Sequence, residues 1–381
     1  MKRNKRNTKN TEVISFIDLL SQSETKSGQI VTPLRAMQTS AVYACVGLLS
    51  DTVAQMPLKL YQGSGMTRRE RRDHWIYKLL VKCPNSWQTG FMFRNTAMMS
   101  LCLRGNFYAY KVRDTEGHVI ELLPLSADSV EVRQLENWDL EYRVTLKGGV
   151  SRICSQKDIF HVAYRSINGY TGISPIGWQR ETVGLTLSAQ EHGSRTFKNG
   201  ARPSGVLSMD GSLSPESSKR IREEWAEVYG GENTGRVAVL EKGTTYAPIS
   251  MTNADAQFLE TRKFQVEEIA RIFGVPLFMI QSTEKTTSWG SGIEQMMMGF
   301  KTMTLNPYIE CWEGAIYRDL ITEAEENGDE DLEIKFNADG LLQGDIKTRF
   351  YSYQLGINMG VYSPNEIREL ENFNPYEGGE K

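Results

Sequence analysis

Apolar residues recur at helical spacing in several stretches of the chain, and each stretch predicts an amphipathic helix. In the first stretch, Val42, Val46 and Leu49 fall on one face. Ser174 and Pro175 stand directly before another, where a capping serine and a first-turn proline are typical. The predicted helices cover residues 41–56, 90–103, 176–197, 255–273, 293–321, 346–356 and 364–370.

Shorter segments alternate between apolar and polar residues, which predicts strands. Because each such strand has one apolar face, we expect a largely antiparallel sheet packed on helices, and hence an α+β fold. A compact insert interrupts the two long helices 176–197 and 255–273, so its ends should lie close together. The predicted strands are residues 58–61, 107–113, 119–124, 130–134, 142–146, 159–162 and 332–336, and the insert adds strands 205–209, 236–241 and 245–249 with a helix 215–229.

A polar loop at residues 282–292 separates two of the longest predicted helices. It follows a helix stop at Gly274 and Pro276, and it places Trp289 among small, hydroxyl-bearing residues. The phosphate-binding pattern G-x-x-x-x-G-K-[ST] is absent, which argues against a nucleotide loop. We interpret the segment as a mobile loop that grips or slides along a surface. In the helix after it, Pro307 predicts a kink.

The composition is that of an ordinary globular protein. The 381 residues, 40% of them hydrophobic, allow two or three domains. No apolar run approaches the ~20 residues that span a membrane, and the basic start has no apolar core behind it, so we expect neither a membrane span nor a secretory signal. A net charge of −3 argues against wrapping nucleic acid with the whole surface, although it permits local basic patches.

No metal or cofactor site is expected from the cysteines and histidines. The five cysteines are scattered without a C-x-x-C pair, which favours buried free thiols in a reducing cytosol. The four histidines show no ligand spacing. The three methionines at 296–298 favour a core or a subunit interface. The basic run at 68–72 could contact phosphate, but a solvated loop is the favoured interpretation.

One weak pattern points to an enzyme. Glu333 and Lys335 match half of a metal-dependent nuclease site, with Asp319, Asp329 and Asp331 as candidate ligand residues. The half-motif is common by chance, and no Pro-Asp pair precedes it at a suitable distance. The pattern G-x-S-x-G is also absent. We therefore favour a non-enzymatic protein.

The order of short blocks along the chain is more specific than any single motif. Taken together, these blocks resemble HK97-type phage portal proteins over roughly residues 36–379. The blocks are residues 39–46, 56–61, 84–85, 105–109, 158–161, 172–176, 197–205, 269–276, 304–307 and 360–368.

The resemblance implies a ring, usually of twelve subunits, at one vertex of a tailed-phage capsid. Double-stranded DNA would pass through the axis of that ring without sequence-specific contacts. The implied partners are further copies of the chain, terminase, head-completion or adaptor proteins, and the major capsid and scaffolding proteins. The implied location is the virion, and the host cytoplasm during assembly. A role in initiating capsid assembly is also implied, with no cofactor.

The resemblance also implies a division of the chain. It assigns a flexible basic segment to 1–35, a wing to 36–172, stem helices to 173–199 and 251–276, a clip to 200–250, a tunnel loop to 277–292, a long helix returning to the wing to 293–344, and a short crown to 345–381.

Two groups of candidate site residues follow from this division. In the tunnel loop they would face DNA, although a solvated lysine or a local tryptophan anchor would fit as well. On the clip helix they would dock partners, although a solvated face is the simpler interpretation. The loop group is Thr283, Lys285, Thr286, Thr287, Ser288, Trp289 and Ser291, and the clip group is Lys219, Arg220, Arg222, Glu223 and Glu224.

Two alternatives to a portal protein stay open at this point. One is the metal-dependent nuclease. The other is a different ring-forming structural protein of the particle, such as a head-completion adaptor, against which the length and the insert between two long helices both count.

Overall fold

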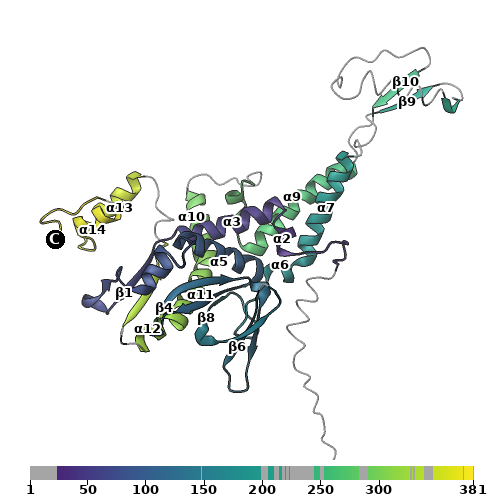
Figure 1. Cartoon of the computed structure of the whole chain (residues 1–381). Helices are drawn as coiled ribbons and strands as arrows, with labels where there is room; N and C mark the ends of the chain where they lie inside the picture. The colour runs from purple at the N-terminus through teal and green to yellow at the C-terminus, as the bar shows by residue number, and fades with distance from the viewer. Residues whose placement is uncertain are drawn as a thin grey trace, which may run out of the picture. The chain divides into compact units, whose positions relative to one another are not determined.

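The computed structural model describes most of the chain (Figure 1). The described residues are 24–146, 148–198, 205–209, 214–216, 219, 223, 244–248, 253–282, 291–326, 328, 331–338, 346–371 and 373–380. They divide into a first unit, Met1–Gly184 with Val266–Lys381, and a second unit, Leu185–Gln265.

The first unit contains three antiparallel sheets of three strands each, among its described residues, rather than the single sheet expected from the alternation. Their strand orders are β11-β1-β2, β4-β3-β8 and β5-β6-β7. Short 3₁₀ turns at Ala127–Ser129 and Gln156–Asp158 carry the chain between the last two sheets, so neighbouring strands in sequence enter different sheets. The strands are β1 Leu58–Gln62, β2 Arg69–Glu70, β3 Asn106–Arg113, β4 Val119–Leu125, β5 Val130–Gln134, β6 Leu140–Thr145, β7 Ser151–Ser155, β8 Ile159–Ala163 and β11 Leu332–Phe336.

Most predicted helices are confirmed within two residues at each end. Two segments differ more. The helix predicted for 293–321 continues to Glu326, and the segment 176–197 breaks at Gln179 (φ −102°, ψ 26°) into α6 and α7. The helices are α2 Pro33–Ala36, α3 Ser40–Gln55, α4 Trp75–Tyr77, α5 Gly90–Arg104, α6 Pro175–Trp178, α7 Arg180–Lys198, α9 Asn253–Phe273, α10 Ser291–Gly299, α11 Asn306–Ile316, α12 Thr322–Glu326, α13 Ile346–Asn358 and α14 Pro364–Leu370. None of the described helices is long and apolar enough to cross a membrane.

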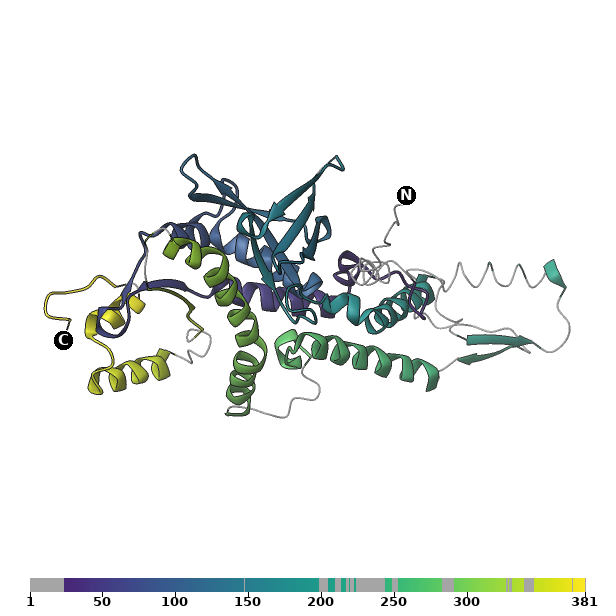
Figure 2. The same ribbon diagram turned by 90° about the horizontal axis from the view of Figure 1, so that it is seen from below.

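Residues 291–326 form one continuous helical run, which Figure 2 shows as a bent rod. The predicted kink at Pro307 takes the form of a π-helical segment, Phe300–Leu305, directly before α11. Proline lacks the N–H that would bond to the carbonyl four residues earlier, and a wider π turn accommodates that loss. A second π segment, Tyr317–Ile321, precedes α12.

Trp312 on α11 lies at the centre of the first unit's core and is fully buried. Its ring centroid lies 6.2 Å from that of Phe107 on β3, 6.0 Å from that of Phe160 on β8 and 6.2 Å from that of Phe336 on β11. Its indole N–H reaches the sulfur of Met98 on α5 at 3.2 Å. One side chain thus joins two sheets and two helices.

The cysteines are free, but they are not uniformly buried. Cys45, Cys102 and Cys154 are buried, whereas Cys83 is exposed and Cys311 is half-buried. Burial raises the pKa of Cys45 to about 12, so that thiol stays protonated and behaves as a small apolar side chain.

The described part of the second unit includes a strand pair and two helical segments. Strands β9 Gly205–Met209 and β10 Thr244–Pro248 pair antiparallel. The ring of His192 on α7 meets that of Phe258 on α9 edge-on at 5.5 Å. The predicted strands 205–209 and 245–249 are therefore confirmed, whereas the strand 236–241 and most of the helix 215–229 lie outside the described residues.

We expect Trp312→Ala to lower the free energy of unfolding by about 3–5 kcal/mol, because it removes a large buried side chain that several elements share. Urea unfolding followed by circular dichroism measures the loss. The matched control is Trp138→Ala, since Trp138 is 79% exposed, and its change should stay within about 0.5 kcal/mol. Equal effects of the two changes would contradict this view of the core.

Candidate functional site

The C-terminal part of the helical run is fastened to β8 by a pair of neighbouring charged residues. Asp319 is buried, and its Oδ2 accepts the backbone N–H of His161 at 2.9 Å. Arg318 donates from Nη2 to the carbonyl of His161 at 2.5 Å and from Nε to Asp319 at 2.6 Å. Burial acts to lower the pKa of Arg318, but its bonds to Asp319 raise the pKa above the usual value, so the ion pair persists.

A second buried contact joins the same run to β3. Lys111 is 3% exposed, and its Nζ donates to the carbonyl of Asp319 at 2.8 Å and to Glu323 at 3.1 Å. Arg113 also binds the Glu323 carboxylate. Burial alone would raise the pKa of Glu323, but these two cations lower it below its usual value. Breaking such a buried pair by removing one partner is strongly destabilising.

His161 continues this contact network toward α6. Its Nδ1 lies 3.2 Å from the hydroxyl of Tyr142, and its Nε2 lies 3.1 Å from Oδ1 of Asn106. That same oxygen accepts the N–H of Gly172 at 2.7 Å. Burial, aided by the charge of Arg318, lowers the pKa of His161 to about 3, so the ring is neutral at physiological pH.

The close approach of Gly105 and Gly172 completes the link. Gly105 has φ +74°, which favours glycine, and a Cβ there would lie 2.1 Å from the carbonyl oxygen of Ile173. The segment before α6 is therefore held against the end of α5. Hydrogen bonds run without interruption from the helical run, through β8 and β3, to the residues that precede α6.

The two sides of the predicted loop are tied together at their base. The hydroxyl of Thr304 donates to the carbonyl of Gly274 at 2.7 Å. Gly274 ends α9 with φ +66°, and a Cβ there would lie 3.0 Å from Oγ1 of Thr304. The chain between these residues therefore begins and ends at one fixed point, whatever conformation the loop adopts.

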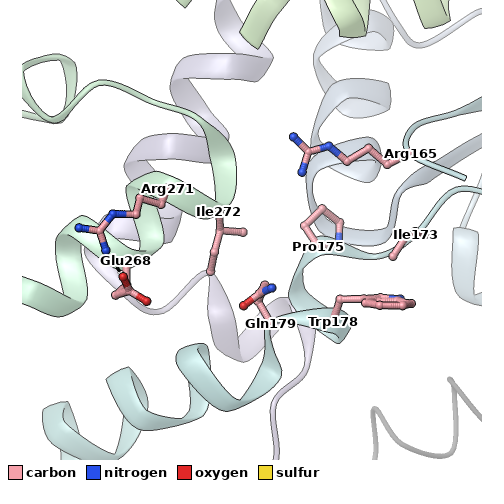
Figure 3. A pocket seen from close by; sticks show the side chains of 8 residues that line it. All are labelled: Arg165, Ile173, Pro175, Trp178, Gln179, Glu268, Arg271 and Ile272. Atoms are coloured by element: carbon pink, nitrogen blue, oxygen red, sulfur yellow. Dashed lines mark hydrogen bonds and ion pairs between the residues drawn. The ribbon is translucent and has the colours of Figure 1, made fainter. Parts of the chain in front are cut away.

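A pocket of about 380 Å³ lies between α6 and the end of α9 (Figure 3). Figure 3 shows the side chain of Arg165 extending toward the α9 side, while Arg271 and Glu268 turn toward each other as an ion pair. Arg165 has φ +50°, an uncommon backbone conformation for a residue with a side chain. Trp178 at this pocket is 53% exposed. The lining is thus mixed, with apolar and cationic side chains.

A larger groove of about 1180 Å³ lies beside the buried network. Its lining combines the cations of that network with several carboxylates, including the exposed Glu116 and Glu326 and the half-buried Glu141. A mixed-charge lining of this kind suits a polypeptide surface better than a phosphate backbone.

The predicted site residues fall mostly outside the described part of the chain. In the loop, only Ser291 is described, as the first residue of α10. Thr283, Lys285, Thr286, Thr287, Ser288 and Trp289 lie outside. On the clip, Lys219 and Glu223 are exposed, with 3.9 Å between Nζ and Oε1, and Arg220, Arg222 and Glu224 lie outside.

The nuclease half-motif is engaged in ion pairs. Lys335 Nζ binds Glu313 at 2.8 Å, and Arg68 binds Glu333 at 3.0 Å. Buried Asp319 is bound by Arg318 and His161, so it faces neither residue as a free metal ligand. In the described ranges, the ligand atoms that lie close enough for a metal belong to the exposed residues Asp114, Glu116 and His118 on the β3–β4 turn.

The run at 68–72, expected to be a loop, contains the short strand β2, and its arginines bind partners within the chain. Arg71 binds Asp73 at 2.9 Å, and Arg72 binds Glu70 at 2.8 Å and Glu369 at 2.7 Å. The methionines are less buried than a core would require, since Met298 is 58% exposed. The exposure of Met298 favours a subunit interface over a core position for the methionines at 296–298.

The pairings of Arg318 and Lys111 are not predictable from the sequence pattern. The pattern singles out Asp319 only as a candidate metal ligand, because a neighbouring Arg-Asp pair carries no periodic signal. One signal is available in the sequence: the alternation of β3 places Lys111 at an inward position, where a charged residue needs a partner.

Comparison with known proteins agrees with this fold. The family model described as "Phage portal protein" matches residues 40–372. The portal protein of Enterobacteria phage HK97 is 35% identical over 349 residues, which cover 91% of this chain and 81% of the relative. The probable portal protein of Streptomyces phage phiC31 is 35% identical over 368 residues, covering 93% and 78%. A chain in the neck of a native gene transfer agent particle, computed with C12 symmetry, superposes with a TM-score of 0.61 at 23% identity, covering 89% and 91%.

The architecture and these matches define a structural protein of the head–tail connector of a phage particle. The chain belongs to the phage portal protein family.

We expect the pH dependence of stability to report on His161. Its folded pKa lies below the ~6.5 of an exposed histidine, so the unfolded state binds more protons and stability falls as pH drops from about 6.5 toward 3. His161→Gln should remove a slope of about 1.4 kcal/mol per pH unit between pH 6 and 5, as measured by urea unfolding.

The control for this measurement is Trp138→Ala, which changes an exposed side chain without a titratable group and should keep the wild-type slope. The window above pH 5 separates His161 from Glu323, whose carboxylate contributes stability that is lost at lower pH. An unchanged slope in His161→Gln would show that the ring does not titrate as argued.

Proposed function

We propose that twelve copies of this chain form a ring at one capsid vertex, through which double-stranded DNA enters and leaves the particle. The observation that carries the proposal is the match to portal proteins along almost the whole chain, at 35% identity to the HK97 relative. The C12 symmetry of a structural relative's particle neck supports the subunit number. The same ring would dock terminase first and head-completion proteins later, and it would contact capsid and scaffolding proteins.

The charge balance suits a conduit for DNA. Each neutralised phosphate adds affinity through counterion release, so a strongly basic channel would hold DNA in place. A subunit with a net charge of −3 avoids that, and sparse polar donors in the loop can guide the duplex. Hydroxyl contacts to phosphate carry no sequence information, which a conduit for any genome requires.

The predicted division of the chain is kept as part of the proposal. The wing would hold residues 36–172, the stem α6, α7 and α9, the clip residues 200–250 and the crown residues 345–381. The Gly274–Thr304 bond supports the tunnel-loop assignment, because a loop that moves along DNA needs a fixed base. Exposed apolar side chains on α13 and beyond, such as Tyr351 and Met359, support crown contacts between copies.

A catalytic function has no support from the described residues. The family is structural, and the nuclease half-motif is occupied by the ion pairs of Arg68 and Glu313. We therefore infer a virion protein without activity on DNA, present in the host cytoplasm during assembly.

Deleting residues 286–291 should leave ring assembly intact while impairing DNA packaging or retention. The deletion removes Trp289 and most hydroxyl donors but keeps both Gly274 and Thr304, so the base of the loop is preserved. Native mass spectrometry measures the ring, and nuclease-protected DNA measures packaging. Variant particles that fill and hold a genome normally would show that the loop is only structural.

Charge reversal at Arg220 and Arg222 should weaken terminase docking and leave the ring intact, because mixed-charge faces set docking rates and orientation. Sedimentation with purified terminase at low and moderate salt measures binding. The matched control reverses Arg133 and Arg143, which lie on the exposed face of β5–β6. Equal docking by both double variants would remove the clip helix from the proposal.

A further inference from the structure

Arg94 on α5 is a buried cation whose charge has no partner among the described residues. The residue is 6% exposed, and neither Nε nor Nη1 has a hydrogen-bond partner. The other buried lysine, arginine, aspartate and glutamate side chains of the described residues all form ion pairs: Lys111 with Glu323, Glu313 with Lys335, and Asp319 with Arg318. The nearby acid on α3, Asp51, is bound instead by Asn95 at 2.7 Å.

An unpaired buried charge is expensive for a single chain. Burial lowers the pKa of Arg94, with only the charge of Tyr77 opposing it. The positions beside it on the helix, Phe93, Ala97 and Met98, are apolar and fully buried. A methionine would therefore suit position 94 of an isolated subunit better than an arginine does. An anion that binds Arg94 in the assembled particle would offset the free-energy cost of burying this charge.

The start of α5, where Arg94 lies, has the composition of an interface centre. Phe91 precedes it by one helical turn and is 43% exposed. Met92 and Trp87 at the same end of α5 are 50% and 66% exposed. Aromatic residues, methionine and arginine are the types enriched at the buried centres of protein interfaces, where lysine and glutamate are depleted.

We propose that Arg94 is the centre of a contact between neighbouring copies of this chain: a carboxylate of the second copy binds its guanidinium, and the same copy covers Trp87, Phe91 and Met92. The proposal rests on the ring of the proposed function and names one of its two contact faces. Rings close through heterologous contacts, in which this face meets a different surface of the next copy. Both surfaces are therefore present on every subunit.

A carboxylate from another copy fits this position better than a DNA phosphate does. A surface that binds DNA presents several exposed cations along the duplex, and its affinity comes from their sum. Arg94 is a single cation, almost covered and bordered by apolar side chains. The chain itself carries 47 acidic against 44 basic residues, so a neighbouring copy has carboxylates to offer.

The variant Arg94→Met tests the proposal through two effects of opposite sign. Removing an unpaired buried charge should raise the melting temperature of the isolated subunit by a few degrees, measured below the assembly concentration. The concentration needed to form half of the rings should rise about tenfold or more, because the partner's carboxylate then has no counter-charge. Differential scanning fluorimetry and native mass spectrometry measure the two quantities.

Two matched variants separate this effect from general damage. Arg143→Met removes an arginine whose pair with Glu131, at 3.6 Å, is on the surface, and it should change neither quantity. Trp87→Ala should impair assembly, whereas Trp138→Ala, which also removes an exposed tryptophan, should not. Because Trp87 is on the surface, its variant keeps the test decisive if Arg94→Met does not fold.

Mixing tests the head-to-tail arrangement. A subunit with a defective Arg94 face still offers its other face, so a minor fraction of Arg94→Met should block ring closure by wild-type subunits. Normal rings from Arg94→Met and from Trp87→Ala would overturn the inference while leaving the ring proposal standing. Intact rings that retain DNA poorly would instead assign Arg94 to phosphate. If the wild-type protein forms no ring, the proposed function itself is contradicted.

Discussion

The packing around Trp312 is the constraint on which the rest of the first unit depends. The strands that meet its ring come from widely separated parts of the chain and belong to two different three-stranded sheets. The indole draws β3, β8 and β11 onto one helix and sets where α11 lies. The charged contacts of Arg318, Asp319 and Lys111 then fix the direction in which the helical run continues.

A rigid helical run gives the loop before it a defined base. The Thr304–Gly274 bond closes that base, and the π segment Phe300–Leu305 adjoins it. π turns are less regular than α turns and frequently occur at functional positions. The described elements on either side of the loop are held by a close-packed core and buried ion pairs. A base fixed in this way would suit the channel of the proposed function.

Local patterns predicted local structure well. The start and stop signals around α9 placed it within two residues, since Gly274 supplies the left-handed conformation that ends a helix. Strand β7 was missed because it is mostly polar, with Cys154 as its one buried residue. The split into three sheets also escaped prediction, because strand pairing joins residues as distant as Leu58 and Phe336. The pattern of apolar and polar residues does not reveal that Asp319 is paired or that Arg94 has no partner among the described residues. The proposed loop and clip residues follow only from the resemblance to a family.

Lys111 and Arg94 are both buried cations, but Lys111 is paired within the chain and Arg94 is proposed to pair with a neighbouring copy. Both are cations on elements that pack against the core, and both are more than nine-tenths buried. Lys111 finds its carboxylate within the chain, so its charge specifies how β3 meets the helical run. Arg94 has no such carboxylate among the described residues, so its buried charge destabilises the isolated subunit. In the proposed ring, a carboxylate of a neighbouring copy would remove that cost, and the difference would favour closing the ring.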